Sequence, residues 1–174
     1  IDIFCATCGP GLIGGLLVGS TFAKSLALGQ EKPFIPINHL EGHLLSLTFN
    51  NNNCFPSLVF LLTGGHTQIY YVKSIGNYEI LGETVDDAIG ESFDKVAKLL
   101  KLKYPGGPEI EKKARFGNDK KFELPHPLIR KKNLNFSFSG IKTAVSVIIK
   151  NKKIINKNII QDMSASFQSK IISI

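Results

Sequence analysis

Two histidines spaced four residues apart, His39 and His43, are the side chains best suited to chemistry in this sequence. On a helix, side chains at i and i+4 lie one turn apart on the same face. Both imidazoles could then reach a single metal ion, although such a pair is often structural or solvated. Glu41 lies about 200° around the helix from both. The residues therefore do not form the His-Glu-x-x-His arrangement of metalloproteases.

A second chemical feature is the glycine-rich segment at residues 63–67, Thr-Gly-Gly-His-Thr. It is typical of a strand, a tight turn and a strand, where the backbone can approach a ligand closely. Residues 8–11 and 106–107 form two more glycine-rich turns. Backbone amides in such turns can hold phosphate or another polar ligand. Neither the Walker pattern nor G-x-G-x-x-G is present, and each turn alone has an ordinary structural explanation.

Carboxylates near the third glycine turn are further candidates. Asp94 lies near Glu91 on the charged side of an expected helix, where a solvated face is the default interpretation. Glu111 follows Gly107 by four residues, one turn into the next expected helix. It could therefore point back toward whatever that turn binds.

Polar residues late in the chain are more ambiguous. Ser137, Ser139 and Lys142 could bind a phosphate, but serine-rich turns are common without a ligand. His126 lies between two prolines and is expected in a loop rather than at a metal.

The size and hydropathy of the chain suit one substantial core or two small lobes. It has 174 residues, 43% of them hydrophobic. The sequence contains no run of 18 apolar residues and therefore predicts no membrane-spanning helix, and no secretory signal is visible. The chain begins at Ile1 rather than Met and ends at Ile174 inside an expected helix. We therefore expect a fragment of a longer protein, incomplete at both ends.

The cysteines argue for a reducing, cytoplasmic setting. There are three, with no repeated spacing. Cys5 and Cys8 have the spacing of a redox or metal pair, but Cys5 lies in an apolar run and is expected in the core.

Charge is distributed unevenly along the chain. Residues 1–100 carry five lysines and nine acidic residues, whereas residues 101–174 carry sixteen Lys or Arg and five acidic residues, for a total of +7. A basic half can mark a nucleic-acid surface. The abundance of Lys, Asn and Ile offers another explanation, since a low-GC genome gives the same bias. Clusters at 130–132 and 150–157 could then be solvated faces.

Hydrophobic periodicity and turn residues predict a mixed α/β fold with a lobe boundary near Pro56. Strands are expected at residues 2–7, 34–37, 57–62, 68–73 and 78–83, the last three as an antiparallel meander. Helices are expected at residues 11–28, 39–49, from Asp86 or Asp87 to about 102, 108–114, 141–150 and from 158 onward.

Six motifs in this order closely resemble the TsaD family of tRNA adenosine threonylcarbamoyltransferases, over essentially the whole chain. They are Gly-Pro-Gly at 9–11, His-x-Glu-Gly-His at 39–43, Gly-Gly-His-Thr at 64–67, Asp-Asp-Ala-Ile-Gly-Glu-Ser-Phe-Asp-Lys at 86–95, Tyr-Pro-Gly-Gly-Pro at 104–108 and Phe-Ser-Phe-Ser-Gly-Ile-Lys-Thr at 136–143. The resemblance implies an actin/sugar-kinase/Hsp70-like (ASKHA) fold of two α/β lobes, with residues 1–55 ending the first and 56–174 starting the second.

The resemblance also implies an activity, N6-L-threonylcarbamoyladenine synthesis. The family transfers threonylcarbamoyl from threonylcarbamoyl-adenylate to the adenosine 3′ of the anticodon in tRNA. His39 and His43 would then bind one divalent metal ion, iron or zinc. The implied substrate-binding residues are Leu62, Thr63, Gly64, Gly65, His66, Asp94, Gly107 and Glu111. Expected partners are tRNA and, in bacteria, TsaB-like and TsaE-like proteins, with no membrane.

Some departures from the family pattern limit these expectations. Thr63 stands where many members have Ser, which keeps the hydroxyl. The family's N-terminal strand and phosphate loop, and a C-terminal part with an aspartate metal ligand and an asparagine contact to adenosine, are missing. We therefore expect the 174-residue chain alone to be inactive or nearly so.

Three other functions stay open. A carbohydrate kinase of the same fold would need a phosphate-binding aspartate, and the His pair and Gly-Gly-His-Thr argue against it. A non-catalytic partner subunit would lack the metal histidines. A metalloprotease has neither a nucleophile constellation nor a zinc motif in its favour.

Overall fold

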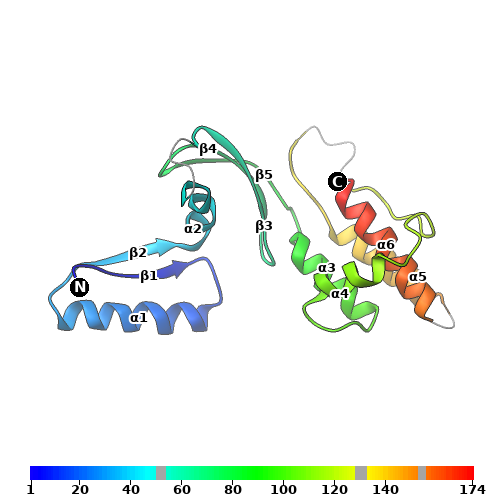
Figure 1. Cartoon of the computed structure of the whole chain (residues 1–174), viewed down its shortest axis with the longest axis horizontal. Coiled ribbons are helices and arrows are strands. Elements are labelled where there is room, and N and C mark those ends of the chain that lie inside the picture. The colour runs from blue at the N-terminus through cyan, green and yellow to red at the C-terminus, as the bar shows by residue number, and fades with distance from the viewer. Residues whose placement is uncertain (50–53, 128–132, 153–155) are drawn as a thin grey trace. The chain divides into compact units, whose positions relative to one another are not determined.

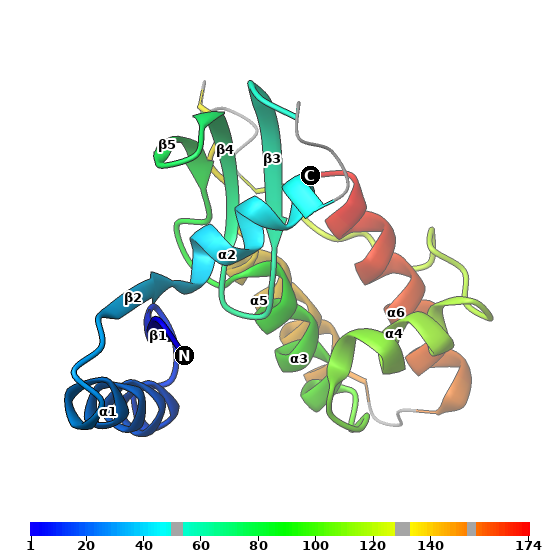
Figure 2. The same cartoon turned by 60° about the vertical axis from the view of Figure 1, so that its left-hand side comes forward.

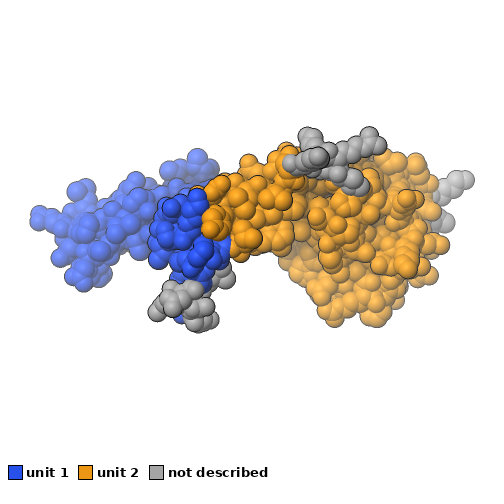
Figure 3. Space-filling model, turned by 90° about the horizontal axis from the view of Figure 1, so that it is seen from above, with its two compact units in different colours: residues 1–57, 72–77 blue, residues 58–71, 78–174 orange. Residues whose placement is uncertain are grey.

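The computed structural model describes residues 1–49, 54–127, 133–152 and 156–174 and has a mixed α/β fold (Figure 1). Two compact units make up the chain (Figure 3). The first contains residues 1–57 and 72–77, and the second contains residues 58–71 and 78–174. None of the described helices combines the length and hydropathy needed to cross a membrane. The basic cluster at 130–132 and part of the one at 150–157 fall outside the described residues.

The first unit is built on a strand–helix–strand arrangement. Its elements are β1 (Phe4–Gly9), α1 (Ile13–Gly29), β2 (Phe34–Asn38), α2 (His39–Leu45) and the 3-10 turn η1 (Ser46–Phe49). β1 and β2 pair in parallel, with Phe4 opposite Phe34 and Thr7 opposite Ile37. Parallel pairing needs a crossover connection, which α1 supplies by lying along the two strands (Figure 1).

The expectation that Cys5 lies in the core is wrong, because its side chain is exposed. Among the described elements, β1 contacts β2, α1 and α2. Two strands and two helices do not cover both faces of an apolar strand. The same limit leaves many side chains of α1 exposed, including Ile13, Val18 and Phe22.

A three-stranded sheet follows. Its strands are β3 (Ser57–Leu62), β4 (Thr67–Ser74) and β5 (Asn77–Glu83), in the order β3-β4-β5. Connections this short join only antiparallel neighbours. The expected meander is therefore present, within one residue at each boundary.

Four helices pack beside one another in the second unit (Figure 2). They are α3 (Ile89–Leu99), α4 (Gly106–Ala114), α5 (Ser139–Lys150) and α6 (Lys157–Ile172). α4 packs against α3 and α6, and α3 also packs against α5. The buried core of this layer consists of Val96, Ala97, Leu100, Ile110, Leu124, Phe138, Ile141, Val145, Ile149, Met163, Phe167 and Ile171.

Three of these helices begin without a capping side chain of their own. The residues at the N-cap positions of α3, α4 and α5 are Ala88, Pro105 and Phe138, and none of their side chains accepts a bond from the first turn. A helix start leaves up to four amides without partners. Side chains from other elements supply the missing acceptors here.

The start of α3 is capped by a side chain from β4, and not by the residues that we expected from the sequence. We expected Asp86 or Asp87 to cap this helix, but the Ile89 amide donates to the hydroxyl of Thr67 instead, at 2.8 Å. Thr67 is fully buried at the start of β4. Its hydroxyl therefore ties the sheet to the first turn of α3.

Replacement of Thr67 by valine tests this link. Valine keeps the shape but removes the acceptor, which leaves a helix-start amide without its partner. We expect the free energy of unfolding to fall by about 1–2 kcal/mol. Thr67→Ser keeps the hydroxyl and should lose less. Urea unfolding of both variants measures the difference, and equal losses would contradict the capping role.

Candidate functional site

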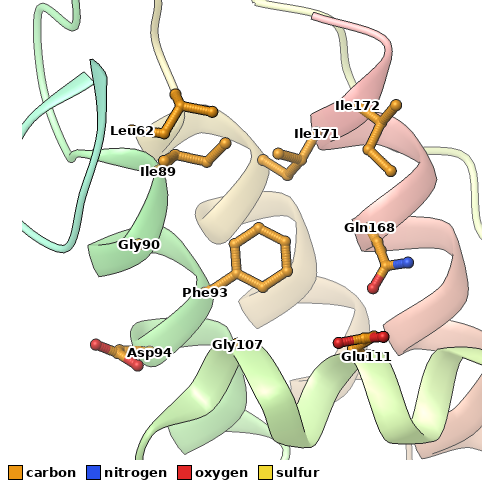
Figure 4. A pocket seen from close by; sticks show the side chains of 10 residues that line it. All are labelled: Leu62, Ile89, Gly90, Phe93, Asp94, Gly107, Glu111, Gln168, Ile171 and Ile172. Carbon is orange, nitrogen blue, oxygen red and sulfur yellow. The ribbon is translucent and has the colours of Figure 1, made fainter. Parts of the chain in front are cut away.

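A pocket of about 530 Å³ opens in the second unit, lined by β3, α3, α4 and α6 (Figure 4). Its lining residues are Leu62, Ile89, Gly90, Phe93, Asp94, Gly107, Glu111, Gln168, Ile171 and Ile172. This volume lies in the range of pockets that hold small molecules. Four residues expected at the substrate site, Leu62, Asp94, Gly107 and Glu111, thus line one pocket although they come from three different elements.

The wall of the pocket is divided by polarity. Leu62, Ile89, Ile171 and Ile172 gather on one side, and Phe93 lies between them and the acidic side chains (Figure 4). The carboxylates of Asp94 and Glu111 and the amide of Gln168 lie toward the other side. A ligand with a flat apolar part and several hydroxyls matches this division.

The turn between β3 and β4 is fixed by the Thr63 hydroxyl. Thr63 Oγ1 accepts from the amides of His66 at 2.9 Å and Gly65 at 3.3 Å. The Thr63 amide donates to the His66 carbonyl at 2.9 Å. Either threonine or serine can supply this hydroxyl. A serine at this position would therefore hold the turn in the same way.

Close backbone packing holds this turn against α3. A Cβ on Gly90 would lie 2.7 Å from the Cα of Gly64 and 3.0 Å from the carbonyl oxygen of Thr63. Only glycine at position 90 allows this approach. Of the expected substrate residues, Thr63 and Gly64 thus adjoin Gly90, which itself lines the pocket, and Gly65 and His66 follow in the same turn.

The default interpretation of Asp94, as part of a solvated helix face, is wrong. The side chain is half-buried, and its Oδ1 accepts from the Gly106 amide at 2.7 Å. This bond caps α4. A Cβ on Gly106 would lie 2.7 Å from both Asp94 Cα and Ala97 Cβ, so the two helices meet at glycine. The other oxygen, Oδ2, has no hydrogen-bond partner in the described part of the chain.

Gly107 and Glu111 complete the α4 wall. A Cβ on Gly107 would meet nothing within 4 Å, so the backbone there is open to a ligand. Glu111 accepts from Arg115 at 2.7 Å, and its side chain is 56% exposed. The pair holds the carboxylate at the mouth of the pocket without burying it.

Sequence reasoning missed Gln168 and Phe93, which also line the pocket. Gln168 lies in α6 with Ile171 and Ile172, three and four residues further on, which is one helical face. That spacing was visible in the sequence, but nothing local connected it to residues 94–111.

The serines at 137 and 139 do not form a free phosphate site. Asp86 accepts from both hydroxyls and from the amides of Phe138 and Ser139. The carboxylate thereby caps α5. Burial raises the pKa of the Asp86 carboxyl, but the four hydrogen bonds outweigh it and bring the pKa below its ordinary value.

Lys142 is also engaged within the protein. It contacts Asp87 at 2.9 Å, and Lys95 contacts the same carboxylate at 2.6 Å and Glu91 at 2.7 Å. Burial raises the pKa of Asp87, but the two lysines outweigh it and lower the pKa overall. Hydrogen bonds to Asp87 and Glu91 raise the pKa of Lys95. This network joins α3 to α5.

His39 and His43 lie in the first unit, on α2. Their ring centroids are 4.6 Å apart, and both residues are exposed. Asn38 fixes the start of this helix by accepting from the amides of Leu40 and Glu41. Two neutral imidazoles at this separation suit a divalent transition metal. Within the described ranges, no group of three His, Cys, Asp or Glu side chains could hold an ion, so further ligands would have to join this pair.

His126 is a loop residue, as expected. Its ring nitrogens lie 3.3 Å from the Pro127 carbonyl oxygen and 3.2 Å from the Ser173 carbonyl oxygen. These contacts join the loop to the end of α6.

The matching family model and two curated relatives share one description. The model of a family described as "TsaD: tRNA N6-adenosine threonylcarbamoyltransferase" matches residues 1–174. Curated relatives with that same name from Rickettsia prowazekii (strain Madrid E) and Rickettsia rickettsii (strain Sheila Smith) are 55% identical over 168 residues. The match covers 97% of this chain but 43% and 49% of those relatives. The chain thus spans about half the length of the curated relatives it matches.

The Asp86 cap makes a pH-dependent contribution to stability. Its pKa is lower in the folded state than the ordinary value near 3.9. The stabilisation is therefore complete above the unfolded pKa and is lost as pH falls through the folded pKa. Asp86→Ala should lower the free energy of unfolding by about 1–2 kcal/mol at pH 7, and this loss should shrink below about pH 4.

Urea unfolding at pH 7 and pH 3 measures this effect. Glu123→Ala is the matched control, because it removes an exposed carboxylate from the same unit. We expect the control to stay within about 0.5 kcal/mol of the wild type. A loss in Asp86→Ala that is equal at both pH values would contradict the assignment.

Proposed function

This chain belongs to the TsaD family, and we propose that its complete gene product transfers threonylcarbamoyl from threonylcarbamoyl-adenylate to tRNA. The acceptor is the exocyclic amine of the adenosine 3′ of the anticodon, and the product is N6-threonylcarbamoyladenosine. The observation that carries this proposal is the divided wall of the pocket between α3, α4 and α6. The family match supplies the reaction, and the pocket supplies a place for the adenylate.

The pocket suits the nucleoside of an adenylate. Phe93 and Ile171 offer an apolar surface on which a flat base can pack. Asp94 and Glu111 each have a carboxylate oxygen that can accept from a ribose hydroxyl, as acidic residues do in other nucleotide sites. We propose that these four residues bind the base and sugar.

The glycine turns suit the remainder of the donor. A Cβ on Gly64, Gly65 or Gly107 would meet nothing within 4 Å, so a ligand can approach the backbone at all three. The backbone amides of Gly64 and Gly107 would stabilise negative charge that develops on the carbamoyl or phosphate oxygens. We propose that Leu62, Thr63 and His66 complete this part of the substrate site.

The metal belongs to the same proposal. His39 and His43 would hold one divalent ion, iron or zinc, with further ligands from elsewhere. When bound, such an ion acts as a Lewis acid that polarises and orients carbamoyl or phosphate oxygens. The role of α2 is to keep the two imidazoles on one face and one turn apart.

The architecture and setting are further proposals. We infer that the mixed α/β fold is part of an ASKHA fold, with residues 1–55 from one lobe and 56–174 from the next. TsaB-like and TsaE-like proteins are the expected partners if the source is bacterial. An enzyme that modifies tRNA acts where tRNA is found, which favours the cytoplasm.

A transfer assay tests the activity directly. We expect the complete gene product, given threonylcarbamoyl-adenylate made with labelled threonine, to label tRNA that has adenosine 3′ of the anticodon. The same tRNA with guanosine at that position lacks the exocyclic amine of adenine and should stay unlabelled. Label in neither tRNA, with partner proteins supplied, would contradict the proposed function.

Metal content tests the histidine pair. The double variant His39→Ala/His43→Ala should lose stoichiometric metal after chelation and reloading, because both imidazoles leave the site. Elemental analysis measures the loss. His126→Ala is the control, since that histidine contacts two carbonyl oxygens, and its metal content should not change. Full metal content in the double variant would contradict metal binding by the two histidines and favour a structural role for them.

A further inference from the structure

We propose that the C-terminal end of α3 and the loop after it bind the phosphate backbone of tRNA. The contacts come from Lys98, Lys101 and Lys103, with Tyr104 beside them, and we call these four residues the α3 patch. The identity of the RNA rests on the proposed function. The binding itself can be measured without any catalysis.

Two hollows with basic linings flank α3. One has a volume of about 590 Å³ and is lined by Lys95, Lys98, Lys101 and Lys142, among others. The other has a volume of about 290 Å³ and is lined by Lys95, Lys98, Lys103 and Tyr104, among others. Lys95 and Lys98 line both. A phosphate would meet Lys98 and Lys101 in the larger hollow, and Lys98 and Lys103 in the smaller one.

The charge of the α3 patch is not balanced within the protein. Lys95 and Lys142 are neutralised by Asp87 and Glu91. No ion pair joins Lys98, Lys101 or Lys103 to a carboxylate in the ranges that the structure covers, and all three are exposed.

Glu109 is a carboxylate whose pKa is lowered in part by the charge of Lys103. Its hydrogen bond to Lys112, at 2.8 Å, is the main cause that lowers its pKa, and the charges of Lys112, Lys113 and Lys103 lower it further. Glu109 therefore already has a cationic partner. The positive charge of the α3 patch stays available to a polyanion.

Lys101 occupies a position where glycine is the usual residue. Its φ is 57°, in the left-handed region. The Lys101 amide donates to Lys98 O at 3.1 Å and the Leu102 amide to Ala97 O at 2.9 Å, which is the Schellman ending of a helix. A lysine in this conformation costs about 1 kcal/mol relative to glycine. Strain of this kind at an exposed cation points to a function other than folding.

Tyr104 favours RNA over an acidic protein as the occupant. It is 84% exposed, directly after Lys103 and beside the smaller hollow. Exposed aromatic rings among cations are platforms for unstacked bases, which RNA loops offer. An anticodon loop combines such bases with closely spaced phosphates.

The α3 patch also adjoins the candidate substrate pocket. Asp94 lines both that pocket and the smaller hollow. RNA held by the lysines therefore lies next to the place where the adenylate would bind. This position suits a substrate whose modified base must reach the pocket.

The test compares tRNA binding and turnover in charge-removing variants of the complete gene product. The patch variant is Lys98→Gln/Lys101→Gly/Lys103→Gln, and the control is Lys120→Gln/Lys121→Gln/Lys150→Gln, three exposed lysines of the same unit. In the patch variant we expect about tenfold weaker tRNA binding or more. The slope of log affinity against log salt should fall by about two to three in magnitude. The kcat at saturating tRNA should stay within about twofold.

A single variant separates a loss of tRNA binding from a loss of folding. Lys101→Gly relieves the left-handed strain, so its Tm should equal or exceed that of the wild type. Its salt slope should still fall by about one.

Unchanged tRNA affinity in the patch variant would overturn the proposal. It would do so even if the same variant had lost the ability to bind an acidic protein. Equal losses in patch and control variants would overturn it as well. If the wild type binds tRNA through the α3 patch but transfers nothing to it, the proposed function fails and this inference stands.

Discussion

Three helices of the second unit, α3, α4 and α5, depend on hydrogen-bond acceptors that lie elsewhere in the chain. The start of α3 is capped by Thr67, that of α4 by Asp94 and that of α5 by Asp86. Amides at a buried helix start cannot be left without partners at low cost. Each cap therefore fixes the place of one element relative to another, and the three together fix the arrangement of sheet and helices.

The candidate substrate site follows from this constraint. The bond that caps α4 also holds Asp94 at the edge of the pocket, with one carboxylate oxygen left for a ligand. The contact of Gly90 with Gly64 sets the β3–β4 turn against α3, the helix that carries Asp94. The residues that hold the helices in place and those that would bind the adenylate are thus partly the same. A substitution at Asp94 or Gly90 would affect stability and ligand binding together.

The sequence predicted local features better than distant ones. The strands of the meander were expected within one residue, because alternation and turn residues are local signals. The spacing also predicted that His39 and His43 share one face of a helix, and both lie on α2 with ring centroids 4.6 Å apart. Asp86 was assigned to the wrong helix, since its partners at 138 and 139 lie more than fifty residues away. Gln168 was missed for the same reason. Periodicity identifies the face of a helix but not which distant element it meets.

The most direct test of this account is hydrogen–deuterium exchange of the complete gene product with a non-hydrolysable threonylcarbamoyl-adenylate analogue. Amides that contact a ligand, or are closed off by one, exchange more slowly. The account predicts slower exchange in the turn at 63–66 and around Gly106 and Gly107. Slower exchange confined to other segments, or none at a saturating concentration, would show that the pocket between α3, α4 and α6 is not the adenylate site.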